Sequence, residues 1–108
     1  MDERSARLAA NETIFRAGNE SIAKVADGKL EQAPFLCECG EATCFARVVL
    51  TPAEYEAVRA HPARFFVVPG HEDLTAGEAV VEECPRYTLV EKQGGEREIV
   101  ERRDPRSS

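Results

Sequence analysis

Three of the four cysteines in this 108-residue chain lie close together, at Cys37, Cys39 and Cys44. Their spacing, C-x-C-x4-C, constrains the local fold because three thiols can meet at one point only where the backbone doubles back between them. Gly40 follows the second cysteine, and glycine tolerates the positive φ that such a reversal often requires. The segment "CECGEATC" therefore predicts a knuckle over residues 35–45 with converging thiols, while the flanking Glu38 and Glu41 are expected to face water.

Converging thiols are typical of a metal site, and zinc takes four ligands in a tetrahedron at about 2.0–2.3 Å. A disulfide between Cys37 and Cys39 would close a strained ring. An iron–sulfur cluster usually has its first two cysteines further apart. A redox sensor needs an exposed thiol of low pKa with a resolving partner. We expect a zinc ion bound by Cys37, Cys39 and Cys44, with a thiol-based redox or metal sensor as the alternative.

The fourth zinc ligand has three candidates: His71, Cys84 and His61. His71 lies in "PGHED", a loop from which a short reach could bring it over the knuckle, and Cys84 would complete an all-thiolate site. His61 closes a predicted surface helix, where an exposed histidine is favoured by the helix dipole. We predict His71, because three thiolates and an imidazole leave a net −1 site in a chain that already carries −6. Cys84 stays as the alternative ligand.

Residues 3–26 have the periodicity of one long helix. Its apolar residues share a stripe about 120° wide, made of Leu8, Ile14, Phe15, Ile22, Val25 and Ala26. Gly28 stands where a helix C-cap is expected. Such a helix would be about 36 Å long, more than the ~26 Å diameter of a domain of this size. We therefore expect residues 3–12 to project and to offer a contact surface. The alternative is that the helix bends or frays near Gly18 and packs entirely on its own domain.

The rest of the chain predicts a small sheet with one further helix. Residues 46–51 and 64–70 are predicted strands, the second apolar on both faces and therefore central. Thr51, Pro52 and Glu54 carry the capping-box signature of a helix that Pro62 ends. Residues 78–83 and 87–93 alternate around Pro85 and predict a hairpin. Residues 94–108 are expected to form a polar, flexible tail, with at most a frayed strand at "REIV".

These elements predict an α+β fold: a long N-terminal helix, a zinc knuckle and a small, mainly antiparallel sheet with one further helix. A chain of this length fits one domain, which we place at residues 1–93, with the sheet and second helix in 46–93. Tryptophan is absent and aromatic residues are few, so a metal cross-link would add useful stability to a modest core.

Composition narrows the function. A net charge of −6 argues against binding a phosphate backbone, and no segment reaches the ~18 apolar residues of a membrane span. Met1 is followed by charged residues rather than the apolar run of a signal peptide, so we expect a cytoplasmic protein. Common catalytic motifs are absent from the sequence. We expect a structural zinc and a module that binds a protein partner, or a second copy, through the N-terminal helix; an enzyme without a recognisable motif is a further alternative.

Two resemblances bear on this interpretation. The knuckle "CECGEATC" resembles the zinc loop that follows the SET domain in protein lysine methyltransferases, C-x-C-G-x3-C, and implies that Cys37, Cys39 and Cys44 bind zinc, but not that the chain transfers methyl groups. Over residues 11–92, "NETIFRAGNESI", "FLCECGEATC", "LTPAEYEAVRAHPARFFVVPGHE" and "YTLVEK" resemble a family of short actinobacterial proteins of uncharacterised function. The wider resemblance implies a stand-alone bacterial domain and no particular mechanism.

Overall fold

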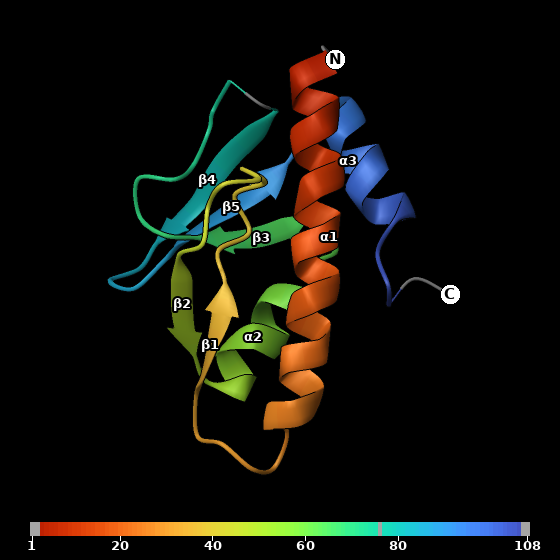
Figure 1. Cartoon of the computed structure of the whole chain (residues 1–108). Helices are drawn as coiled ribbons and strands as arrows, with labels where there is room; N and C mark the ends of the chain where they lie inside the picture. The colour runs from red at the N-terminus through yellow and green to blue at the C-terminus, as the bar shows by residue number, and fades with distance from the viewer. Residues whose placement is uncertain (1–2, 76, 107–108) are drawn as a thin grey trace.

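One long helix, α1 (Glu3–Ala26), runs along the side of the molecule in the computed structural model, which describes residues 3–75 and 77–106 (Figure 1). It is followed in order by β1 (Ala33–Leu36), β2 (Arg47–Leu50), α2 (Pro52–Arg59), β3 (Arg64–Val67), β4 (Glu78–Glu83), β5 (Thr88–Lys92) and α3 (Gly94–Arg102). The predicted α+β class is confirmed, as are the bounds of α1. Gly28 has a φ of 69° and ends α1, as its position predicted.

The strands form two small antiparallel sheets. β1 pairs with β2, and the second sheet has the order β3-β5-β4. The predicted hairpin of β4 and β5 is confirmed. β3 is not central in its ladder as predicted, because β5 occupies that place. Its other edge is nevertheless covered, since the N–H of Glu38 donates to the Phe66 carbonyl at 3.0 Å. The side chains of Phe65, Phe66 and Val67 are all fully buried, which explains why β3 is apolar on both faces.

The aromatic core joins the two sheets to α2. Thr51 and Glu54 form the predicted capping box, which starts α2 and directs Tyr55 inward. Tyr55 stacks on Phe35 of β1 with ring centroids 4.5 Å apart, and Phe66 of β3 meets Phe35 edge-on at 6.2 Å. β1 itself was not expected from the sequence, which placed Phe35 in the knuckle.

The buried face of α1 is more polar than the sequence predicted. It consists of Ser5, Leu8, Ala9, Glu12, Thr13, Arg16, Asn19 and Ala26. Ile14 and Val25, which we expected in the apolar seam, are 66% and 67% exposed. The physical reason is that the interior holds partners for the polar side chains. The carboxyl of Glu12 lies 2.8 Å from the Lys92 Nζ, and the guanidinium of Arg16 lies 3.7 Å above the ring of Phe65.

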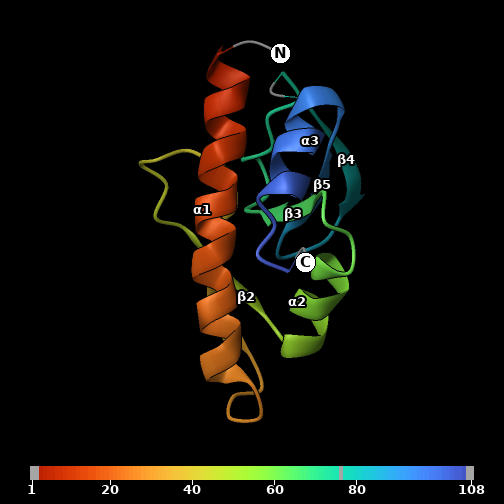
Figure 2. The same cartoon turned by 90° about the vertical axis from the view of Figure 1, so that its right-hand side faces the viewer.

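Residues 3–12 and 94–104 both belong to the packed structure, which corrects two expectations. Residues 94–102, expected to open a flexible tail with a frayed strand, form α3, and its Val100 is fully buried against the core. Asp104 also lies inside, paired with Arg59 of α2. Residues 3–12 do not project, because α3 packs beside this part of α1 and Leu8 is buried (Figure 2).

Among the described residues, no helix is both long and apolar enough to cross a membrane.

Candidate metal centre

The predicted knuckle is the connection between β1 and β2. Cys37 directly follows β1, and its N–H donates to the Ala46 carbonyl at 3.1 Å, which extends the hairpin by one residue pair. The chain then reverses at Gly40, whose φ of 82° confirms the predicted left-handed conformation. A second turn, in which the Cys44 N–H donates to the Glu41 carbonyl at 3.0 Å, brings Cys44 back toward Cys37.

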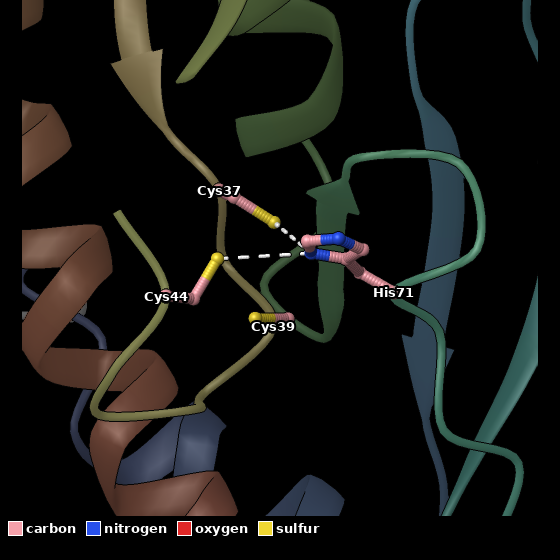
Figure 3. Close-up of side chains that lie close together, drawn as sticks. All are labelled: Cys37, Cys39, Cys44 and His71. Carbon is pink, nitrogen blue, oxygen red and sulfur yellow. Dashed lines mark hydrogen bonds between the residues drawn. The ribbon is translucent and has the colours of Figure 1, made fainter. Parts of the chain in front are cut away.

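His71 reaches the knuckle from the loop after β3. Its N–H donates to the Val68 carbonyl at 2.8 Å, and the two residues between them are Pro69 and Gly70. Gly70 has a φ of 95°. Proline followed by a glycine of positive φ is the signature of a type II turn, which reverses the chain. The turn directs the imidazole back over the three thiols (Figure 3).

The four side chains meet in a geometry suited to one ion. The candidate ligand atoms of Cys37, Cys39, Cys44 and His71 all lie within 4.8 Å of one another. The His71 Nδ1 is 3.6 Å from the Cys37 Sγ and 3.7 Å from the Cys44 Sγ. A tetrahedral zinc with ordinary bond lengths would place a sulfur and a nitrogen ligand about 3.6 Å apart. The donors present therefore fit a metal ion.

The other two candidates for the fourth position lie outside this cluster. Cys84 follows β4, where its N–H donates to the Tyr87 carbonyl at 2.9 Å across the hairpin turn. His61 is exposed just beyond α2, as its predicted position at the end of a surface helix indicated. The grouping selects His71 over both as the neighbour of the three thiols.

The thiols of Cys37 and Cys39 affect each other's pKa through a direct hydrogen bond. A hydrogen bond from Cys37 lowers the pKa of Cys39 to about 5, and the same bond, together with burial, raises the pKa of Cys37. The Val68 N–H donates to the Cys37 Sγ at 3.2 Å. Backbone donors of this kind stabilise negative sulfur and tune a metal centre from its surroundings. Negative charge in this pair is therefore favoured on Cys39, where a cation would neutralise it.

Glu38, between the first two cysteines, does not face water as expected. Its side chain is fully buried, and its carboxylate accepts hydrogen bonds from the Asn19 amide at 3.0 Å and from the Phe66 N–H at 3.3 Å. Burial raises the pKa of Glu38, against the opposing charge of Arg16. The exposed Glu41 does behave as expected. Glu38 thus anchors the C-x-C segment to α1 and β3.

The role of α1 in holding the knuckle was not predicted from the sequence. The amide of Asn19 also donates to the Leu36 carbonyl at 3.0 Å, while its Oδ1 accepts from the Leu36 N–H at 2.7 Å. Asn11 donates to the Gly40 carbonyl at 3.0 Å. One signal was available in the sequence, because Asn11 interrupts the predicted apolar stripe at a position where an apolar residue would be favoured.

The centre is shielded on one side and open on the other. Cys37 and Cys39 are buried, Cys44 is partly exposed and His71 is exposed. A cleft of about 420 Å³ lies on the open side, lined by Cys39, Glu41, Thr43, Cys44, Phe45, Ala46 and His71. Solvent therefore reaches the centre from the side of Cys44 and His71.

Comparison with protein-family models, with curated proteins and with solved structures finds no match to this chain.

Proposed function

We propose that this chain is a zinc-binding module in which one ion, held by Cys37, Cys39, Cys44 and His71, has a structural role. The observation that carries the proposal is the convergence of these four donors from two distant segments, with all ligand atoms within 4.8 Å of one another. Three thiolates with one imidazole are a common donor set of structural zinc sites. The likeness of the knuckle to the post-SET zinc loop also supports zinc.

A structural role follows from what the ion would connect. It would join the β1–β2 connection to the loop after β3, so that one cross-link ties both sheets together. Four protein donors leave no open coordination position for a substrate, and a thiolate-rich ion is a poor Lewis acid. Thiols that must stay reduced to bind zinc fit a reducing compartment, and we place the protein in the cytoplasm.

The module would act by binding another protein or a second copy of itself. Because the apolar side of residues 3–12 packs against the rest of the molecule, the proposed contact moves to the outer face of α1, where Ile14 and Val25 are exposed. Exposed large apolar side chains on one helix face favour association. Replacing both Ile14 and Val25 by serine removes this surface and leaves the metal donors unchanged. We expect this double variant to lose self-association or partner binding. We also propose that the chain belongs to the family of short actinobacterial proteins that its sequence resembles.

Metal analysis of purified protein tests the centre itself. We expect one zinc per chain, and we expect His71→Ala to weaken zinc binding strongly while Cys84→Ser, the matched control, leaves it unchanged. Cobalt substitution provides a second readout, because its visible absorption reports tetrahedral thiolate ligation. A chain that loses metal on Cys84→Ser and keeps it on His71→Ala would contradict the assignment.

A further inference from the structure

The donors of the candidate centre differ in their access to solvent. Cys37 and Cys39 are 1% and 9% exposed, whereas Cys44 is partly exposed and His71 is exposed. Cys37 is also held by backbone on two sides, because its N–H donates to Ala46 and its Sγ accepts from Val68. Among the three clustered thiols, Cys44 is therefore the one that a dissolved molecule meets first.

The cleft beside the centre gives such a molecule room. Its volume of about 420 Å³ is large compared with the roughly 30 Å³ that one water occupies in the liquid. The Cys39 and Cys44 side chains both line it, whereas Cys37 does not. A small neutral oxidant can thus reach one thiolate while a second thiolate borders the same space.

We propose that a hydroperoxide releases the zinc by oxidising Cys44, with Cys39 as the resolving thiol. The proposal rests on the zinc centre described above and adds its regulation: the metal is retained in a reducing environment and released under oxidant. Cys44 and Cys39 have four residues between them, which a disulfide can span, whereas one residue separates Cys37 from Cys39 and such a ring is strained. All the donor sulfurs lie within 4.8 Å of one another, so the resolving attack needs only a small movement.

The chemistry uses the peroxide as the sole oxidant. The Cys44 thiolate attacks one peroxide oxygen, so that an S–O bond forms, the O–O bond breaks and hydroxide, or alkoxide from an organic peroxide, leaves. The sulfur becomes a sulfenic acid and the peroxide is reduced by two electrons. The Cys39 thiolate then attacks the Cys44 sulfur, the S–S bond forms, and the S–O bond breaks with loss of hydroxide. The ion has then lost two of its four donors and dissociates.

Cys84 supplies a comparison within the same chain. It is partly exposed, like Cys44, but it lies outside the donor cluster, and burial raises its pKa. A thiol of raised pKa carries less thiolate and is oxidised more slowly. Exposure alone would oxidise Cys84 and Cys44 to a similar extent, whereas the proposal requires Cys44 to react first.

The test treats the zinc-loaded full chain with graded hydrogen peroxide and follows two readouts. A coloured chelator measures zinc release, and peptide mass spectrometry after alkylation locates the oxidised cysteines. We expect release in step with a Cys39–Cys44 disulfide, while Cys84 is unmodified at those doses. A thiol reductant with added zinc should restore the centre.

Cys44→His is the matched variant, because it keeps four zinc donors and removes the exposed thiol. We expect about tenfold slower zinc release from it than from the wild type at equal peroxide. Release with Cys44 unmodified, or with a first disulfide that contains Cys37, overturns the proposal, as does retention of zinc under excess peroxide. Those results would leave the proposal of a structural zinc standing. Untreated protein without bound zinc would overturn both the structural zinc and its release by peroxide. If Cys44→His does not fold, the disulfide map of the wild type alone tests the release.

Discussion

At the scale of single residues, Gly40 shows how closely the knuckle is fitted to α1. A Cβ at this position would lie 2.7 Å from the Leu8 carbonyl oxygen and 3.0 Å from the Glu12 Cγ. Its φ of 82° is also one that other residues rarely adopt. The glycine was predicted from the reversal between cysteines, but its contact with a helix thirty residues earlier was not, because nothing local in a sequence reports a tertiary approach.

Gly40→Ala tests this fit against a matched control, Gly28→Ala. Both glycines have positive φ, but no heavy atom lies within 4 Å of a Cβ built at Gly28. The backbone cost of either substitution is about 1–2 kcal/mol, and only Gly40→Ala adds a steric clash that pushes the knuckle from α1. We predict that Gly40→Ala lowers the free energy of unfolding by clearly more than Gly28→Ala and also weakens zinc binding, measured by denaturation and metal titration. Equal losses in the two variants would mean that the close approach is unimportant.

At the scale of elements, sequence patterns succeeded where local chemistry decides the structure. The bounds of α1, the capping box of α2 and the β4–β5 hairpin follow from periodicity, side-chain caps and a turn residue. The patterns failed where contacts with residues far away in the sequence decide the structure. The inward face of α1 is polar because Lys92 and Glu38 bind its Glu12 and Asn19 side chains. The adjacent glycines Gly94 and Gly95 predicted a flexible tail. The helix α3 forms there instead, because Val100 packs into the core.

The polar face of α1 predicts a pH dependence of stability. Burial raises the pKa of Glu12 from its ordinary value of 4.5 to about 8, although the charge of Lys92 opposes the shift. Between these pH values the unfolded chain has released the proton that the folded chain keeps, so stability falls as pH rises and levels off above about 8. The slope from this one group is at most about 1.4 kcal/mol per pH unit.

Glu12→Gln removes the titration at this position and keeps the shape of the side chain. We predict that the free energy of unfolding falls less between pH 6 and 8 in this variant than in the wild type, measured by denaturant titration at each pH. Glu31→Gln, at an exposed position before β1, is the control and should keep the wild-type slope. Parallel slopes for wild type and Glu12→Gln would show that the buried carboxyl does not titrate in this range.

At the scale of the whole molecule, the proposed ion joins the two sheets, which few backbone hydrogen bonds connect. The two sheets have separate ladders, and the crossing between them runs through the Glu38 N–H, which donates to the Phe66 carbonyl, and the Cys37 sulfur, which accepts from the Val68 N–H. Cysteine spacing predicted this centre because three soft donors within a short loop are typical of a metal site. The turn that delivers His71 could be predicted from Pro69 and Gly70, but its place over the knuckle depends on how β3 packs beside β1.

Thermal unfolding before and after verified metal removal shows whether the zinc ion holds the fold together. The binding free energy of a structural zinc is also folding free energy, on the order of 10 kcal/mol in small zinc domains. The aromatic core remains without the ion, so we predict a loosened chain whose melting temperature is lower by at least about 10 °C. Cys39→Ser should melt like the stripped protein and be insensitive to chelator. An unchanged melting temperature after the zinc has been removed would contradict a structural role for the metal.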